Sequence, residues 1–142
     1  MTRAMFVTVL YRMAGRPEVE GESGFTDLRQ DWYKDAVTWA VGLGITNGTT
    51  ETTFSPTDPV TREQAAVFLF RYAKAMGQLD LFPAAAYTGK VGELHAWGQA
   101  EVLWALGSGL LRGRESTMLL PGDPAPRSLL AVVLLNYGKL AG

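Results

Sequence analysis

The chain of 142 residues is similar to itself when it is shifted by 65 positions. When residues 32–72 are aligned with 97–137, 16 of the 41 pairs are identical without a gap. A shift of 59 positions aligns the start of the chain with the second half of the middle unit. Such a period is typical of proteins in which each repeat is a small unit that packs against its neighbours. We therefore expect two and a half repeats, over residues 1–16, 25–77 and 87–142.

Each full repeat has the pattern of a helix, a loop and a second helix. In the middle repeat, apolar residues at helical spacing predict a first helix with Asp31 as its N-cap. Gly42 and Gly44 are typical of its C-terminal end. A loop rich in Thr, Asn, Gly and Pro follows over residues 46–59.

The second helix of the middle repeat has a clear start signal. Thr61 is the expected N-cap, and Gln64 three residues later completes a capping box. The apolar residues of 66–73 cover a broad surface, which indicates a helix buried on most sides. Together these patterns predict an all-α protein of helix-loop-helix repeats, with the second helices forming a central bundle and the first helices an outer layer.

Composition excludes several classes of protein. The 13 basic and 14 acidic residues give a net charge of -1, which argues against nucleic acid as the main partner. Apolar residues make up 47% of the chain, so disorder throughout is excluded. Cysteine is absent, so neither disulfides nor thiolate metal sites can form. The longest apolar run, residues 129–135, is too short to cross a bilayer, and we expect no membrane insertion.

The residue types needed for catalysis are not gathered in a recognisable pattern. His95 is the single histidine, and its repeat partner is Gln30. No nucleophile, histidine and acid can be combined with confidence, and no close pair of acids recurs between the repeats. We therefore expect no enzymatic activity, no cofactor and no metal.

An arginine recurs at the first turn of each second helix, as Arg3, Arg62 and Arg127. A cation there is disfavoured by about 0.3–1 kcal/mol because the helix N-terminus carries partial positive charge. Free amides together with a guanidinium would make an anion site, suited to carboxylate as well as phosphate. The alternative is that each arginine pairs with an internal acid, for which Asp58 and Asp123, four residues earlier, and Asp27 are available. Both arrangements can hold together.

Aromatic residues also recur. Trp32 and Trp97 stand at the predicted helix starts, where a ring can either pack on a sugar or belong to the core. Trp39 and Trp104 stand mid-helix, where core packing is expected. Tyr33 follows Trp32. The Asn47-Gly48 pair predicts a turn with positive φ whose amides can face a ligand, or a turn and nothing more.

These residues resemble the S-layer homology family of bacterial surface proteins. The matching elements are Phe25-Thr26-Asp27, Trp32-Tyr33, Gly44-Ile45, Gly48, Phe54 with Pro56, and Val60-Thr61-Arg62-Glu63. The resemblance implies a pseudo-threefold prism of three units. It also implies non-covalent attachment to the cell wall, mainly in Gram-positive bacteria. The ligand implied is a secondary cell-wall polysaccharide, commonly capped by a pyruvate ketal that carries a carboxylate, bound in grooves between units.

We predict glycan binding by nine residues: Arg3, Arg62, Arg127, Asp27, Trp32, Tyr33, Asn47, Gly48 and Thr61. Among them, the resemblance implies that the three arginines of the Thr-Arg-Ala-Glu-like motif contact the anionic sugar. The glutamate that the family has at the fourth position of its Thr-Arg-Ala-Glu-like motif is absent, because Met5, Gln64 and Leu129 stand there. The third unit departs further, with Tyr87-Thr88-Gly89 and Arg112 in place of Phe-Thr-Asp and Asn47.

The function expected is therefore a non-enzymatic cell-wall anchor that binds an acidic polysaccharide. The alternative is a protein interaction or self-assembly module on the same scaffold. Because half of the first repeat is missing, we expect its remaining helix to expose apolar surface. Either further chain upstream, carrying the export signal, or a second copy in a homo-oligomer would cover that surface. We favour the former, a fragment of a larger exported surface protein with Met1 in the place of Val60.

Overall fold

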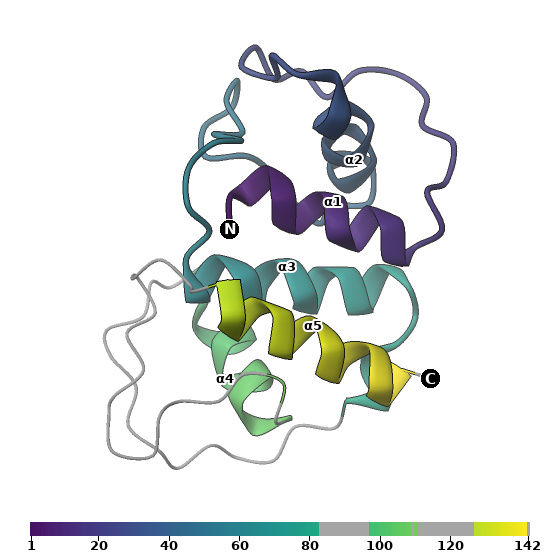
Figure 1. Ribbon diagram of the computed structural model, residues 1–142, viewed down its shortest axis with the longest axis vertical. Coiled ribbons are helices and arrows are strands. Elements are labelled where there is room, and N and C mark those ends of the chain that lie inside the picture. Colours follow the sequence, from purple (N-terminus) through teal and green to yellow (C-terminus); the bar gives the residue numbers. More distant parts are fainter. Residues whose placement is uncertain (83–96, 109, 111–126, 142) are drawn as a thin grey trace. The chain divides into compact units, whose positions relative to one another are not determined.

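The computed structural model describes residues 1–82, 97–108, 110 and 127–141 (Figure 1). These residues form α1 (Arg3–Met13), α2 (Asp31–Gly42), α3 (Arg62–Ala75), α4 (Gln99–Gly107) and α5 (Arg127–Ala141), with a 3-10 turn, η1 (Leu79–Leu81). Extended pairing within the described part is limited to an antiparallel bridge between Thr2 and Pro59. The all-α class predicted from the sequence is confirmed.

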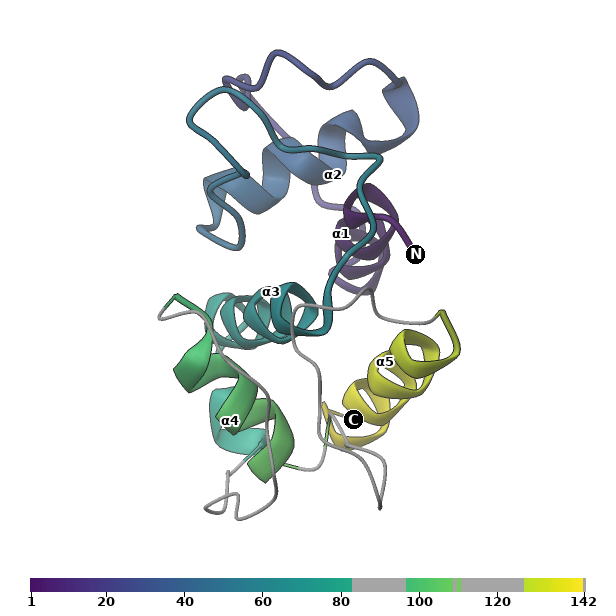
Figure 2. The same cartoon turned by 90° about the vertical axis from the view of Figure 1, so that its left-hand side faces the viewer.

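The chain divides into two compact units, residues 1–60 and residues 61–142. In the first unit α1 packs on α2, and in the second α3 packs on α4, as Figure 2 shows for the teal and green helices. Each of these helix pairs joins the second helix of one predicted repeat to the first helix of the next. The packing is therefore offset from the sequence repeat by half a repeat.

The core of the first unit joins α1 and α2. Phe6, Val7 and Leu10 of α1 have no exposed surface, and Trp39 of α2 is 7% exposed. The rings of Tyr11 and Trp39 lie 5.4 Å apart. Full burial of a large apolar side chain contributes about 1.5–3 kcal/mol. The expectation that α1 exposes its apolar face is wrong for these side chains, and α2, from the following repeat, is the helix packed against it.

The two ends of α2 differ in how well the sequence predicts them. The N-cap is Gln30, so the prediction of Asp31 as N-cap is wrong. The hydroxyl of Tyr33, the third residue of the helix, accepts the backbone N–H of Arg29 at 3.0 Å and of Gln30 at 3.3 Å, the two residues just before the helix. The predicted end is confirmed, since α2 stops at Gly42 and Gly44 follows with φ of 73°.

The second unit is built on α3. Thr61 is the N-cap and Gln64 completes the capping box, as predicted. The expected broad buried surface is also confirmed, because the following residues of α3 are buried: Ala65, Ala66, Val67, Phe68, Leu69, Tyr72 and Ala73. None of the helices in the described part combines the length and apolar character that crossing a membrane requires.

Tyr137 fastens α5 to the segment that follows α3. Its hydroxyl donates to Oε1 of Gln78 at 2.6 Å, and its ring stacks on Phe82 at 4.5 Å between centroids. The side chain is 1% exposed, and burial raises the pKa of the Tyr137 phenol above its ordinary value. The phenol is therefore protonated, and able to donate this hydrogen bond, at neutral pH.

Candidate functional site

Arg3 is the first residue of α1 and is 4% exposed. Its Nε donates to the carbonyl oxygen of Phe54 at 2.9 Å, and its Cζ lies 4.7 Å from the centroid of the Phe54 ring. Burial lowers the pKa of Arg3 to about 10, while the charges of Asp58 and Asp27 act to raise it. The guanidinium is therefore positive at neutral pH and is bound to the carbonyl oxygen and ring of Phe54, while Asp58 and Asp27 act on it through their charges.

Asp27 binds the same short segment. Its Oδ1 accepts the backbone N–H of Phe54 at 3.0 Å, and its Oδ2 accepts that of Ser55 at 2.9 Å. Hydrogen bonds to an ionised carboxylate contribute about 1.5–3 kcal/mol each. Ser55 has φ of 59°, a conformation that costs a residue other than glycine about 1–3 kcal/mol. The two hydrogen bonds that Asp27 accepts offset the cost of this conformation at Ser55.

The amides at the start of α1 are engaged by the chain itself. The N–H of Arg3 donates to the carbonyl oxygen of Asp58 at 2.9 Å, and that of Ala4 to Pro56 at 3.1 Å. The N–H of Met5 donates to the hydroxyl of Thr2 at 3.1 Å. The expectation of free amides for an anion is therefore wrong at these three positions. The Thr2–Pro59 bridge explains this, because it holds residues 56–58 beside the helix N-terminus.

Arg62 and Arg127 begin α3 and α5. The side chain of Arg62 is partly exposed, in contrast with Arg3. The hydroxyl of Thr61 accepts the N–H of Gln64 at 3.1 Å and so serves as a helix cap. The side chain of Arg127 lies outside the described residues, as do His95, Arg112 and the segment Tyr87-Thr88-Gly89.

Trp32 presents a fixed and exposed ring. It is 51% exposed, and its indole N–H donates to Oε1 of Gln30 at 2.7 Å. Its ring meets that of Tyr33 edge-on at 4.9 Å, and Tyr33 is itself 3% exposed. Trp97, the repeat partner of Trp32, is 48% exposed.

The two mid-helix tryptophans lie in apolar surroundings. Trp39 is buried against Tyr11, and Trp104 packs edge-on to Phe70 at 5.3 Å and to Phe82 at 6.1 Å. Core packing, expected for the mid-helix tryptophans, is confirmed for Trp39. For Trp32 and Trp97 the sequence left core packing and exposure open, and the structure shows exposed side chains.

The loop over residues 46–55 contains the predicted turn. Gly48 has φ of 83°, and Asn47 is exposed. The amides of the turn are engaged within the loop, because Gly48 donates to the hydroxyl of Thr46 at 3.1 Å and Thr49 to the carbonyl oxygen of Thr53 at 2.9 Å. The expectation that this turn offers its amides to a ligand is wrong for these two residues.

Sequence reasoning missed the hydroxyl network of this loop. The hydroxyl of Thr49 lies 3.0 Å from that of Thr53 and 2.7 Å from that of Ser55. The threonine-rich run over residues 49–53 is the sequence signal from which this network could have been predicted. Among the residues that the structure describes, no group of three or more His, Asp or Glu side chains is arranged to hold a metal ion.

Comparison with known proteins places these features in a family. Residues 24–66 match the family model described as S-layer homology domain. The chain is 32% identical over 120 residues to a "Surface-layer 125 kDa protein" of Lysinibacillus sphaericus, covering 82% of this chain and 10% of that protein. It is 25% identical over 142 residues to an "Amylopullulanase" of Thermoanaerobacterium thermosulfurigenes, covering 99% of this chain and 8% of that protein.

The chain thus spans about a tenth of the length of these relatives. The matched segment contains the Asp27 contacts, the exposed ring of Trp32 and the loop over residues 46–55, and it ends with the first residues of α3. Through residues 24–66, the chain belongs to the S-layer homology domain family.

Proposed function

We propose that this chain anchors a larger surface protein non-covalently to the bacterial cell wall by binding an acidic, pyruvylated secondary cell-wall polysaccharide. The observation that carries the proposal is the S-layer homology match over residues 24–66, since such domains are cell-wall anchoring modules and not catalytic ones. The two relatives carry names of different kinds, one a surface-layer protein and the other an enzyme. A module shared by such different proteins suits attachment better than chemistry.

In the first unit, the proposed contact surface is the ring of Trp32 with the exposed side chain of Asn47 in the Asn47-Gly48 turn, whose own amides are engaged within the loop. A sugar packs well on an aromatic face, and this ring is half exposed. The bond to Gln30 and the contact with Tyr33 hold the ring before ligand arrives, so binding requires little further ordering. Trp97 offers a second ring of the same exposure, and two weak contacts with one polymer reinforce each other by avidity.

The acidic group of the polysaccharide is assigned to Arg62. A guanidinium matches a carboxylate with two parallel hydrogen bonds, and Arg62 is partly exposed at the start of α3. Arg127 has the same place at the start of α5 and stays a prediction from the repeat. Thr61 contributes by capping α3 and so fixing the backbone from which Arg62 extends.

Binding to purified cell-wall sacculi tests the proposal. We expect Arg62→Ala to weaken binding about 10- to 100-fold, the loss of one charge-assisted contact, with little change in melting temperature. The matched control is Lys74→Ala, which removes an exposed cation from the same helix and leaves binding unchanged. Equal losses of folding and of binding in Arg62→Ala would instead give Arg62 a structural role.

A second comparison separates the proposal from its alternative. Sacculi are tested intact, after chemical removal of the pyruvate ketal, and after extraction of the secondary polymer. We expect binding to fall at the first treatment and to disappear at the second. Binding that persists without the polymer would identify a protein interaction or self-assembly module in place of a glycan anchor.

A further inference from the structure

Arg3 and Asp27 hold the peptide segment Phe54-Ser55 from two sides. Arg3 binds the carbonyl oxygen and the ring of Phe54, and Asp27 binds the N–H groups of Phe54 and Ser55. We propose that Arg3 is a positioning residue for glycan binding, which fixes the loop over residues 46–55 from within the fold and does not touch the glycan. This inference rests on the proposed function and changes the role that the family resemblance implies for Arg3.

The exposure of Arg3 favours an indirect role. The side chain is 4% exposed, so a ligand would have to draw the guanidinium out of its buried place to bind it. That movement would break the bond from Nε to Phe54 and leave a buried carbonyl oxygen without this donor, which costs about 1–3 kcal/mol. It would also remove the cation from the face of the Phe54 ring.

The effect of Arg3 reaches the glycan-facing turn through the two arms of the loop. Beyond Phe54, the hydroxyl of Ser55 lies 2.7 Å from that of Thr49. The carbonyl oxygen of Thr53 accepts the N–H of Thr49 at 2.9 Å and that of Thr50 at 3.2 Å. The arm that Arg3 holds is therefore bonded directly to the arm that contains Asn47 and Gly48.

A second route runs through aromatic packing. The rings of Phe25 and Phe54 lie 5.8 Å apart. The Phe25 ring in turn fills the space beside Gly48, where an added Cβ would lie 2.5 Å from Cε1 of Phe25. A displacement of Phe54 therefore shifts the ring against which the turn is packed.

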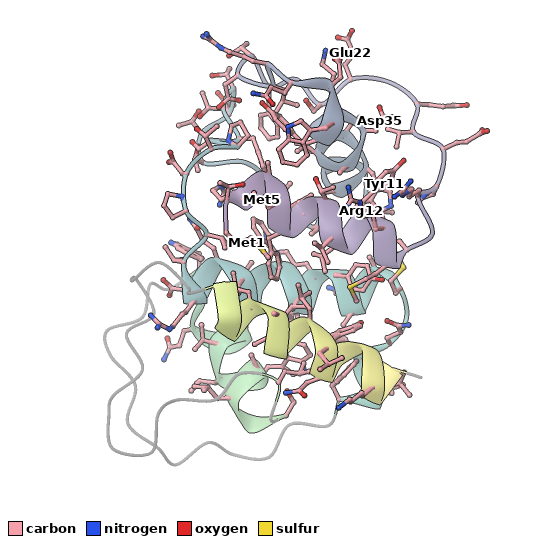
Figure 3. All side chains as sticks on the ribbon, in the orientation of Figure 1. Met1, Met5, Tyr11, Arg12, Glu22 and Asp35 are labelled. Carbon is pink, nitrogen blue, oxygen red and sulfur yellow. The ribbon has the colours of Figure 1, made fainter. Side chains whose placement is uncertain are left out.

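The variant that tests this is Arg3→Lys, which keeps the charge and loses the Nε donor and the planar group over the ring. We expect faster amide hydrogen exchange at Phe54 and Ser55 and about tenfold weaker binding to sacculi. The slope of log affinity against log salt concentration should equal that of the wild type, because no ionic contact with the ligand is lost. Arg12→Lys is the matched control, an exposed arginine on the same helix (Figure 3), and should change neither binding nor exchange.

Two results would overturn the proposal. One is wild-type affinity in Arg3→Lys despite faster exchange, which would show that binding does not depend on the held loop. The other is a salt slope lowered by about one charge in Arg3→Ala with loop amides still protected, which would make Arg3 a direct ligand contact.

Asp27→Asn carries the test if Arg3→Lys fails to fold. It leaves Arg3 in place and removes one of the two acceptors for the loop amides. Weaker binding of Asp27→Asn to sacculi, with the same dependence of affinity on salt as the wild type, supports the proposal. Wild-type binding together with faster hydrogen exchange of the loop amides overturns it. If the wild-type chain itself does not bind sacculi, the proposed function fails, while hydrogen exchange in Arg3→Lys still decides whether Arg3 holds the loop.

Discussion

The ring of Phe25 occupies the space beside Gly48 that a side chain at this position would need. A Cβ on Gly48 would lie 2.5 Å from Cε1 of Phe25 and equally close to the carbonyl oxygen of Thr53. Gly48 also has φ of 83°, which disfavours any residue with a side chain. Glycine is therefore required here by both the conformation and the space.

We predict that Gly48→Ala destabilises the protein by about 2–4 kcal/mol, from backbone strain and overpacking together. The measurement is the free energy of unfolding in urea. Gly42→Ala is the control, because Gly42 is the last residue of α2 and a Cβ there meets no atom within 4 Å. It should change stability by less than about 1 kcal/mol, on the stabilising side. Similar losses of unfolding free energy in Gly48→Ala and Gly42→Ala would contradict strain and overpacking at Gly48 as the cause.

The four tryptophans should separate into two behaviours. Trp39→Ala removes a buried ring and should cost about 3–5 kcal/mol of unfolding free energy. Trp32→Ala should cost less than about 1 kcal/mol, because the residue is 51% exposed. Its effect should appear in sacculus binding, weakened about 3- to 10-fold by the loss of about 1 kcal/mol of ring contact. Strong destabilisation by Trp32→Ala with normal binding would assign that ring to the fold.

The second unit should lose stability in alkaline solution. Burial raises the pKa of the Tyr137 and Tyr72 phenols, so the folded chain holds these protons to higher pH than the unfolded chain does. The stability they contribute is complete below about pH 10 and is lost as the pH rises above it. Tyr137→Phe should lower the free energy of unfolding by about 1 kcal/mol at neutral pH, because the hydrogen bond to Gln78 is lost. The stability of this variant should also fall less steeply with rising pH than that of the wild type.

Urea unfolding at a series of pH values measures this effect. Tyr11→Phe is the matched control at neutral pH, because it also removes a hydroxyl that donates over 2.6 Å, here to the carbonyl oxygen of Pro17. An alkaline decline in Tyr137→Phe as steep as in the wild type would exclude Tyr137 as its source.

Features that depend on neighbours in the chain were predictable from the sequence. The cap formed by Thr61 and Gln64 is such a feature, because both partners lie within one helical turn. The same reasoning failed at Asp31, where an aromatic hydroxyl satisfies the amides before the helix. The capping pattern looks for a short polar side chain ahead of the helix, and Tyr33 lies inside it.

The surroundings of the recurring arginines were predictable only in part. Sequence reasoning identified Asp27 and Asp58 as acids available to the recurring arginines, with Asp58 placed four residues before Arg62. The structure puts both near enough to Arg3 to influence its pKa. It could not identify the carbonyl oxygen of Phe54 as a partner, because this residue is 51 positions away in the chain and no sequence pattern indicates a backbone acceptor. A backbone acceptor can be any residue, so only the folded loop reveals it.

The contact between Glu63 and Gly98 shows how the half-repeat offset in packing bears on amino-acid substitutions in such a protein. The two residues belong to successive repeats, and a Cβ on Gly98 would come within 2.6 Å of Cγ of Glu63. The corresponding residues one repeat earlier are Ala4 and Tyr33. Compensating substitutions are thus to be sought between adjacent copies of the duplicated sequence rather than within one copy. Exchanging a single copy between homologous arrays would separate residues that pack against each other.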